Sequence, residues 1–349
     1  MKILQVSPGY FPAVGGVEQH VRNISERMAQ EHEVTVFATD PFGEFPKGEN
    51  INGVLVRRFK SFSPQNAYHV SLEMLRELRR SEFDIVHGHN YHAFPIFFSR
   101  YASKERFVVT PHYHGRGSTM TRDSLIRLYK PIGKKIFQEA DMVIAVSNYE
   151  KALLAKDFKI ADDKIAVIPN GIDLAEFKDL EKVRKKHKTI LYVGRLEDYK
   201  GVQYVIHTLP LLDAGFRLEI VGNGPYREHL IGLSRELGLE DRIDFYQDLP
   251  REELLHKYAM ADLLVLLSKY ESFSIVVAEA LASRTPCIVA DTSALTEWVD
   301  NKNCFGVDYP VNIAQLAESI YEVIGREVGE VKLWDWDEVV EETVRIYKG

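Results

Sequence analysis

The sequence lacks several features that would assign it to a common class of protein. It has only two cysteines, Cys287 and Cys304, too few for a disulfide framework, so we expect a reducing, cytoplasmic setting. No apolar run approaches the roughly 18 residues needed to cross a bilayer, so we expect no membrane span. The formal net charge of -7 lacks the basic excess of a general nucleic-acid binder, so we expect no nucleic-acid partner.

The usual nucleotide-binding signatures are also missing. Gly15 and Gly16 follow the first apolar run, but neither the G-x-G-x-x-G spacing nor a P-loop is present. A glycine pair lets the backbone approach a ligand closely, and it equally suits an ordinary turn. Both interpretations of Gly15 and Gly16 stay open at this point.

What the chain does contain is a repeated alternation of short apolar runs with helical stretches. Runs that are apolar on both faces and alternate with helices are typical of buried parallel strands. Because 349 residues exceed what one core usually serves, we predict two doubly wound, Rossmann-like α/β domains that face each other across a cleft. The predicted strands are Ile3–Ser7, Val34–Ala38, Val54–Phe59, Asp84–Val86, Phe107–Thr110, Met142–Val146, Ile165–Ile168, Thr189–Val193, Phe216–Val221, Ile243–Tyr246, Leu263–Leu267 and Pro286–Ala290.

The segment Leu180–Lys188 is polar and rich in lysine, which is typical of a linker. It predicts an N-terminal domain over residues 1–180 and a C-terminal domain over residues 181–334. A final helix is predicted over Trp336–Tyr347, and its periodicity does not say which domain it packs against.

The second half carries two cations at the end of a predicted strand. Arg195 and Lys200 follow the run that ends at Gly194, at the edge of the sheet where a phosphate would bind. Arginine offers a planar fork to phosphate oxygens, and lysine offers a point charge. The alternative is a solvated loop with ordinary surface charges.

Two glutamates, Glu271 and Glu279, flank a turn of small residues and the start of a helix. In this turn the backbone N–H groups of Ser274 and Ile275 could bind an anion at the helix N-terminus. Glu271 could hold the hydroxyls of a sugar, and Glu279 those of a ribose. Placement of an acid for the helix dipole would explain Glu271 but not Glu279.

Together these residues resemble the retaining glycosyltransferases of family 4, which have the GT-B fold. The resemblance extends over nearly the whole chain, because short fragments occur in the family's order and spacing. They are Gly15-Gly16-Val17-Glu18, Asp84-Ile85-Val86-His87-Gly88-His89, Thr110-Pro111-His112, Ala145-Val146-Ser147, Ile168-Pro169-Asn170-Gly171-Ile172-Asp173, Val221-Gly222-Asn223-Gly224-Pro225 and Thr285-Pro286-Cys287-Ile288-Val289-Ala290.

The resemblance implies roles for individual residues. Arg195 and Lys200 are expected to bind the donor pyrophosphate, Glu271 the transferred sugar and Glu279 the ribose. Gly222 and Gly224 are expected to border the nucleotide, with the base near Gln247–Leu249. His112 is expected to approach the sugar ring, and Gly15 and Gly16 to line the site. The final helix, about residues 335–349, is expected to cross back onto the N-terminal domain.

The implied activity is transfer of a hexose-type sugar, with retention, from a UDP- or GDP-linked donor to a saccharide or lipid-linked acceptor. No metal and no other cofactor is expected, because Arg195 and Lys200 would neutralise the leaving phosphate. A nucleotide-sugar epimerase and a catalytically silent homologue remain alternatives. The sequence departs from the family where Ser272, Ser274, Ser283, Arg284 and Gln247 replace common glycines, and this puts the donor's identity in doubt.

Two other clusters were weighed for function. Five histidines, His87, His89, His92, His112 and His114, lie near the ends of two predicted strands, and their H-x-H spacing allows a metal-hydrolase interpretation. That interpretation leaves the Arg–Lys and Glu–Glu pairs unexplained. The basic, amphipathic segment 122–136 could bring the enzyme to a membrane surface, or it could simply pack on its domain with a solvated basic face.

Overall fold

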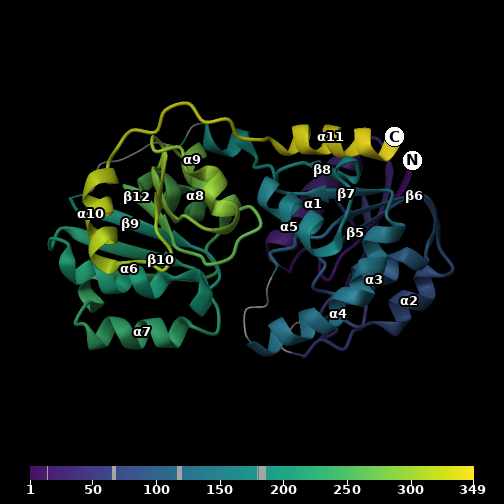
Figure 1. The fold of residues 1–349 in the computed structure, drawn as a ribbon, viewed down its shortest axis with the longest axis horizontal. Coiled ribbons are helices and arrows are strands. Elements are labelled where there is room, and N and C mark those ends of the chain that lie inside the picture. Colours follow the sequence, from purple (N-terminus) through teal and green to yellow (C-terminus); the bar gives the residue numbers. More distant parts are fainter. Residues whose placement is uncertain (14, 65–67, 116–119, 179, 181–185) are drawn as a thin grey trace. The chain divides into compact units, whose positions relative to one another are not determined.

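The computed structural model describes residues 1–13, 15–64, 68–115, 120–178, 180 and 186–349, without the side chains of residues 120–128 (Figure 1). The chain divides into two compact units. Unit 1 consists of Met1–Gly171 with Trp336–Gly349, and unit 2 consists of Ile172–Asp335. Among the described residues, no helix combines the length and the apolar character that crossing a membrane requires.

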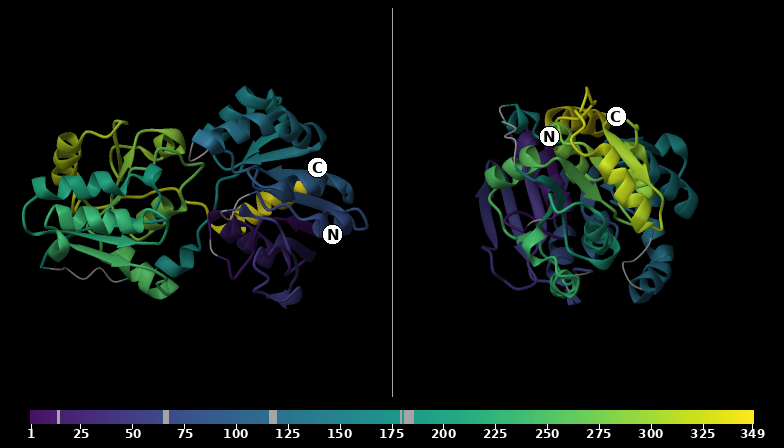
Figure 2. Two further views of the ribbon diagram at one scale, coloured as in Figure 1. Left: turned by 90° about the horizontal axis from the view of Figure 1, so that it is seen from below. Right: turned by 90° about the vertical axis from the view of Figure 1, so that its left-hand side faces the viewer.

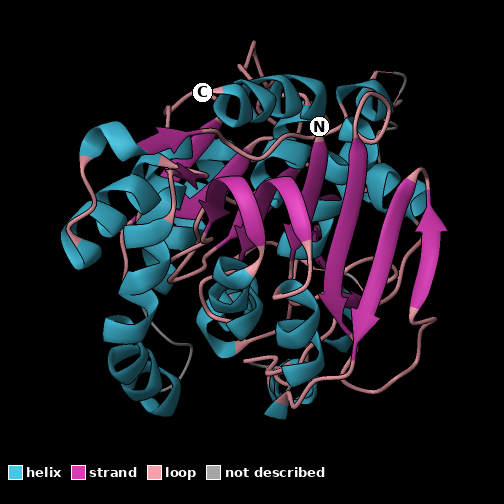
Figure 3. Cartoon of the chain, turned by 90° about the vertical axis from the view of Figure 1, so that its right-hand side faces the viewer, coloured by secondary structure: helices cyan, strands magenta, loops and turns pink. Residues whose placement is uncertain are grey.

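Unit 1 is built on an eight-stranded sheet with the order β3-β4-β2-β1-β5-β6-β7-β8. All neighbouring strands are parallel except β3 and β4, which are antiparallel at one edge. The twist of this sheet from strand to strand is visible in Figure 3. Its strands are β1 Lys2–Val6, β2 Glu33–Thr39, β3 Gly48–Ile51, β4 Val54–Phe59, β5 Glu82–His89, β6 Ser103–Thr110, β7 Met142–Ala145 and β8 Ile165–Val167.

The helices of unit 1 follow the strands and cover the sheet, so that both strand faces are buried, as parallel sheets require. The core between these layers is largely aliphatic and aromatic, with Leu4, Phe37, Val86 and Phe107 almost completely buried. The helices are α1 Gly16–Met28, α2 Leu72–Leu78, α3 Phe94–Phe98, α4 Met120–Glu139, α5 Asn148–Phe158 and α11 Trp336–Lys348.

Unit 2 is built on a six-stranded, fully parallel sheet with the order β11-β10-β9-β12-β13-β14. The strands are β9 Lys188–Val193, β10 Phe216–Val221, β11 Ile243–Tyr246, β12 Leu263–Leu266, β13 Cys287–Ala290 and β14 Cys304–Val307. The helices are α6 Val202–Thr208, α7 Arg227–Glu236, α8 Arg251–Met260, α9 Ile275–Ala282 and α10 Ile313–Val323.

The predicted doubly wound α/β class is confirmed, and each predicted apolar run forms a strand within a few residues of its expected bounds. Strands β3 and β14 were not predicted. The two units divide at Gly171 and Ile172, earlier than the expected boundary at residue 180. The reason is that Ile172 donates its N–H to the carbonyl of Trp334 at 2.9 Å, which ties this segment to unit 2. Residues 179 and 181–185 of the predicted linker lie outside the described residues.

Helix α11 belongs to unit 1, although it is the last element of the chain. It lies beside α1 (Figures 1 and 2), and Arg27 of α1 forms an ion pair with Asp337 at 2.9 Å. Near its end, the Tyr347 hydroxyl is buried against Gln5 of β1 and His87 of β5. The helix is therefore anchored to the middle strands of the unit 1 sheet.

Candidate active site

The candidate site of unit 2 lies at the carboxyl edge of its sheet, meaning the edge where the parallel strands end. Strand β9 pairs with β10 on one side and with β12 on the other, so the chain reverses its winding direction at β9. Ligands of open α/β sheets bind at this kind of topological switch point. The loops after β9, β10 and β12 carry the predicted donor-site residues.

Lys200 and Glu271 meet across this switch point. The Lys200 Nζ lies 2.6 Å from the Glu271 Oε1, and each side chain is only 16% exposed. Burial alone would lower the pKa of Lys200, but the Glu271 carboxylate raises that pKa above its ordinary value. The lysine is therefore held fully charged in a partly buried place, as a binding site for phosphate requires.

Arg195 has a different environment, although it lies on the same loop. Its side chain is 62% exposed, and its Nε lies 3.3 Å from the Glu197 carboxylate, a contact that solvent weakens. Tyr192 donates its hydroxyl hydrogen to the Arg195 carbonyl at 3.0 Å, which fixes the backbone and leaves the guanidinium outside the core. Arg195 is thus the cation of this edge that is accessible to a ligand.

Two glycines after β10 allow the loops of this edge to approach one another closely. Gly222 and Gly224 adopt positive φ angles of 149° and 159°. A Cβ atom at Gly222 would overlap the carbonyl oxygen of Gly194, and one at Gly224 would overlap that of Leu196. Both positions therefore require glycine because the backbone of the loop after β10 lies against the backbone of the loop after β9. No side chain fits between the two loops.

The turn before α9 presents backbone N–H groups at the same edge. Ser274 is the N-cap of the helix and has φ 88° and ψ 85°, a left-handed conformation, and Ile275 is the first helical residue. The Trp298 Nε1 donates to the carbonyl of Phe273 at 2.8 Å, and the Glu271 N–H donates to Ser293 Oγ at 3.0 Å. These bonds hold the turn from both sides.

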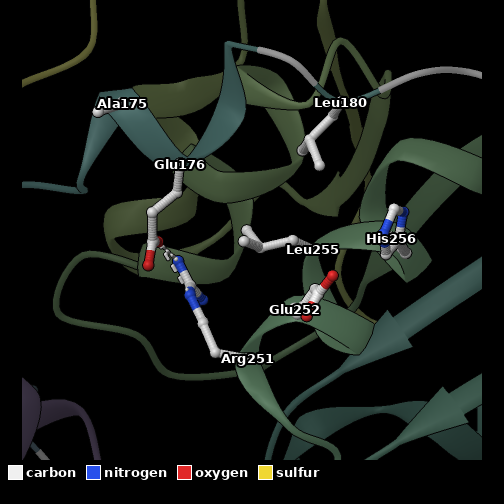
Figure 4. Close-up of a pocket in the computed structure, with 7 residues that line it drawn as sticks. All are labelled: Ala175, Glu176, Leu180, Arg251, Glu252, Leu255 and His256. Atoms are coloured by element: carbon white, nitrogen blue, oxygen red, sulfur yellow. Dashed lines mark hydrogen bonds and ion pairs between the residues drawn. The ribbon is translucent and has the colours of Figure 1, made fainter.

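Glu279 is buried in α9 and forms an ion pair with Arg251 of α8. The Arg251 Nη1 lies 2.6 Å from Glu279 Oε1. Its Nη2 lies 2.6 Å from Glu176 Oε2, and Figure 4 shows this second contact. Burial would lower the pKa of Arg251, and the two carboxylates, Glu279 first, raise it instead. Arg251 and Glu176 also line a cavity of about 480 Å³ with Leu180, Leu255 and His256. Leu249, expected near the base, packs against the core just before α8.

At the corresponding edge of unit 1, the glycine pair lies at the start of α1. Gly15 is the N-cap in an extended conformation, and Gly16 is the first helical residue. A Cβ at Gly15 would overlap the Glu18 carboxylate, whereas a Cβ at Gly16 would meet nothing within 4 Å. Gly15 therefore makes room for an acidic side chain that turns back over the helix start, and Gly16 leaves the backbone open.

His112 lies just after β6, at the carboxyl edge of the unit 1 sheet. It has a φ of 48°, and it is buried among other histidines, with the His20 ring centroid 5.0 Å away. Burial, and then the nearby His20, lower the pKa of His112 well below its ordinary value. His112 is therefore a neutral imidazole, able to accept or donate a hydrogen bond but not to act as a cation.

Of the other H-x-H histidines, His87 is hydrogen-bonded through both ring nitrogens, and His89 is held in the same network through one. His87 lies 2.6 Å from the Tyr347 hydroxyl through Nδ1 and 2.8 Å from Thr110 Oγ1 through Nε2. His89 Nε2 lies 2.8 Å from Gln5 Oε1. Asp84 of the same motif accepts the N–H of Lys2 at 2.7 Å. These contacts join β1, β5, β6 and α11, and they explain the motif without catalysis.

Comparison with known proteins matches both units. Residues 14–176 match Glycosyltransferase Family 4, and residues 175–332 match Glycosyl transferases group 1. An uncharacterized glycosyltransferase of Methanocaldococcus jannaschii is 30% identical, with 100% of this chain and 98% of the relative aligned. The chain belongs to the family 4 glycosyltransferases.

Further relatives of this glycosyltransferase include named synthases. A glycogen synthase of Mycobacterium tuberculosis is 29% identical, covering 99% of this chain and 94% of the relative. Among solved structures, a sucrose-phosphate synthase from Thermosynechococcus elongatus has a TM-score of 0.82 at 21% identity, covering 99% and 98%. Anabaena HepE in complex with UDP-glucose has a TM-score of 0.79 at 17% identity, covering 100% and 99%. These likenesses show two Rossmann-like domains of the GT-B class.

Arg251 and Glu150 are residues of this glycosyltransferase that sequence reasoning missed. No motif or periodicity in the sequence indicates that Arg251 is the partner of Glu279. Glu150 is completely buried, and its carboxylate accepts the N–H groups of Val146, at 2.8 Å, and of Tyr113, the residue after His112. The Ser147-x-x-Glu150 spacing, with the Glu150 N–H donating to Ser147 Oγ at 3.0 Å, was a readable capping signal.

The basic segment 122–136 forms part of α4, but the side chains of its first half lie outside the described residues. In its second half Ile136 is buried, while Ile132 is about half exposed. Lys130 forms an ion pair with Asp157 at 2.7 Å. The described part of the segment thus packs on unit 1 through Ile136.

Proposed function

We propose that this glycosyltransferase moves a hexose-type sugar, with retention, from a UDP- or GDP-linked donor to a hydroxyl group of a saccharide or lipid-linked acceptor. The observation that carries the proposal is the pairing of Lys200 with Glu271 at the switch point of unit 2, next to the exposed Arg195. One buried cation and one accessible cation suit a diphosphate, while the carboxylate suits sugar hydroxyls.

In the proposed reaction the bond between the anomeric carbon and the donor phosphate breaks through an oxocarbenium-like transition state. Negative charge grows on the departing phosphate, and Arg195, Lys200 and the N–H groups of Ser274 and Ile275 stabilise it. Preorganised donors aimed at developing charge are usually the largest catalytic term. Because these groups neutralise the departing phosphate, the proposed reaction needs no metal ion. The acceptor hydroxyl attacks from the face of the leaving group and passes its proton to the departing phosphate, so the anomeric configuration is retained.

Other residues have supporting roles in the proposal. Glu279, oriented by Arg251, holds the ribose, and Gly222, Gly224 and Leu249 border the nucleotide. His112, as a neutral imidazole, approaches the sugar ring, and Gly15 and Gly16 lie on the acceptor side. The relatives support this choice of substrates, since they include a glycogen synthase and an alpha-monoglucosyldiacylglycerol synthase. Two free, buried cysteines fit a cytoplasmic enzyme.

The proposal is tested first by donor binding. A thermal-shift screen of UDP-, GDP- and ADP-linked sugars should show stabilisation by one nucleotide class, because a ligand of the native state raises its stability by mass action. The selected donor is then incubated with acceptor candidates, and the anomeric configuration of the product is read by NMR. Turnover of donor alone into an isomeric nucleotide sugar would identify an epimerase instead.

Arg195→Ala tests the catalytic assignment. We expect kcat to fall by ~10²-fold or more, in the range for one lost oxyanion-type donor. Arg235→Ala is the matched control, since this exposed arginine lies in the last turn of α7 in the same unit. Turnover of Arg195→Ala at the wild-type rate would remove Arg195 from the mechanism.

A further inference from the structure

Three buried imidazoles of unit 1 point nitrogen atoms at a common centre. They come from separate elements, with His20 in α1, His89 at the end of β5 and His112 just after β6. One nitrogen atom of each ring lies within 4.8 Å of the others. All three side chains are buried, so bulk water does not separate them.

For two of the three rings, His89 and His20, hydrogen bonds indicate which nitrogen atom carries the proton. The Gln5 amide nitrogen donates to the Tyr347 hydroxyl at 3.1 Å, so its oxygen faces His89 and accepts the Nε2 proton at 2.8 Å. His89 Nδ1 therefore holds a lone pair. His20 Nδ1 lies 2.8 Å from Asn170 Oδ1, so it donates there and leaves its Nε2 lone pair free.

Two of the nitrogen atoms that remain have no partner among the described residues. His89 Nδ1 and His112 Nε2 are buried and have no hydrogen-bond partner in the part of the chain that the structure describes. Buried polar atoms without partners cost free energy, and lone pairs that face each other also repel. A cation between the rings would remove both costs.

The spacing of the rings suits one metal ion. Three imidazoles on one tetrahedral zinc, with Zn–N distances of about 2.0–2.1 Å, have ring centroids about 5 Å apart. The centroid distances here are 5.0 Å for His20 and His112, 5.5 Å for His20 and His89, and 6.3 Å for His89 and His112. Metal-bound histidines usually donate their second N–H to an oxygen atom, and the side-chain oxygens of Gln5 and Asn170 lie where they can accept these hydrogen bonds from His89 and His20.

We propose that His20, His89 and His112 form a three-nitrogen site for a divalent transition-metal ion of the zinc type, with the fourth position left to water. Imidazole ligands suit zinc, copper, iron and nickel, and the absence of carboxylate and other oxygen ligands from the three-residue set disfavours calcium and magnesium. All three ligands belong to unit 1, whereas the proposed phosphate cations belong to unit 2. An ion there would occupy His112, and a transferase that needs this histidine would then be inhibited.

The test measures binding and not activity, so it stands whether or not the transferase assignment holds. Chelator-treated full-length protein is titrated with Zn²⁺ by calorimetry, and Co²⁺ uptake is followed by visible absorption, which reports nitrogen ligation. We expect one tight ion per chain. Asn170→Ala keeps all three ligands and removes an outer partner, so it should weaken binding by about 10–100-fold. His89→Gln removes a ligand and should weaken binding further.

The matched control is His32→Gln, a half-exposed histidine of unit 1 outside the cluster, which should bind Zn²⁺ as the wild type does. Circular dichroism of the ion-free variants separates loss of a ligand from loss of the fold. Equal Zn²⁺ affinity of wild type, Asn170→Ala and folded His89→Gln would overturn the proposal. So would the absence of a Co²⁺ spectrum in the folded wild type.

Discussion

The carboxyl edges of the two sheets present opposite chemistry on similar scaffolds. In unit 1 helix α1, the end of β5 and the segment just after β6 bring together neutral aromatic rings, with His20, His89 and His112 buried in mutual contact. In unit 2 the loops at the corresponding edge bring together charged groups, and Lys200 and Glu271 form an ion pair at 2.6 Å. The same βαβ winding therefore supports a neutral edge and a charged edge.

The difference teaches how burial acts on a titratable group. Burial disfavours the charged form, and for His20 of unit 1 burial outweighs the hydrogen bond to Asn170, so the pKa of His20 falls to about 4. In unit 2 the Glu271 carboxylate outweighs burial and raises the pKa of Lys200. The local partner, more than the depth of burial, decides whether each edge carries charge.

The most damaging test of the charged edge is Lys200→Met. It would leave the Glu271 carboxylate in a place that is only 16% exposed without its cation, and breaking a buried pair in this way costs about 3 kcal/mol or more. We expect this loss in the free energy of unfolding, measured by urea titration with tryptophan fluorescence. Donor binding should be lost as well.

Two further variants make this test specific. Lys200→Met combined with Glu271→Leu should recover much of the stability, because a buried ion pair can be replaced by apolar groups at little cost. Arg326→Met breaks an exposed i,i+4 pair with Glu322 in the same unit and should change stability little. If Lys200→Met behaves like Arg326→Met, the pair does not organise the edge.

Low pH should instead lower the stability of unit 1, through the buried histidines at its sheet edge. The unfolded chain protonates His20 near its ordinary pKa of about 6.5, whereas the folded protein resists protonation down to about 4. Between these values the unfolded state binds more protons, so stability falls as pH falls. From about pH 7 to about pH 5, His20 alone should lower the free energy of unfolding by about 2 kcal/mol.

Urea titrations of the chelator-treated protein at the two pH values measure this loss, and hydrogen exchange resolved by peptide assigns it to unit 1. His20→Asn should flatten the pH dependence. His87, His89 and His112 have pKa values lowered in the same direction and should add to the slope. A wild-type protein whose unit 1 is equally stable at both pH values would contradict the buried neutral cluster.

Much of the fold was readable from the sequence, because buried parallel strands are apolar on both faces. Strand β3 escaped because Gly48-Glu49-Asn50-Ile51 is an antiparallel edge strand, paired on one side only, and needs no apolar pattern. Strand β14 escaped because it has four residues and contains Gly306. Edge strands obey weaker sequence constraints than central ones.

The candidate site was readable only in part. The sequence predicted that Lys200 and Glu271 follow the ends of two apolar strands. The structure brings these two side chains together in an ion pair. The link from Glu279 through Arg251 to Glu176 depends on three distant segments, and no periodicity connects them. The convergence of His20 on His89 and His112 likewise depends on how α1 packs on its sheet. Contacts between elements are set by tertiary packing, which local patterns do not encode.

The smallest expected effect is an increase in stability, and it concerns a serine that replaces a glycine common in the family. Ser274 has a φ of 88°, a conformation that costs a non-glycine residue on the order of 1 kcal/mol. Ser274→Gly should therefore raise the free energy of unfolding by about 1 kcal/mol, less the entropy that glycine gains in the unfolded chain. Arg284, just after the same helix at φ 58°, should respond to Arg284→Gly in the same direction.

Ser283→Gly is the matched control, because Ser283 has a φ of -78° and its hydroxyl donates to the Glu279 carbonyl at 2.9 Å. This variant should lose stability, although relatives often have glycine there too. The urea midpoints of the three variants therefore show whether glycine stabilises only where φ is positive, as backbone strain predicts, or at every position where relatives have glycine. A stabilised Ser283→Gly together with a destabilised Ser274→Gly would mean that the turn before α9 is not strained, and that the charged edge holds its shape without cost. If Ser274→Gly is stabilised and Ser283→Gly is destabilised, the backbone at Ser274 is strained. Each sheet edge then has a candidate site residue with a positive φ, Ser274 in unit 2 and His112, at φ 48°, in unit 1.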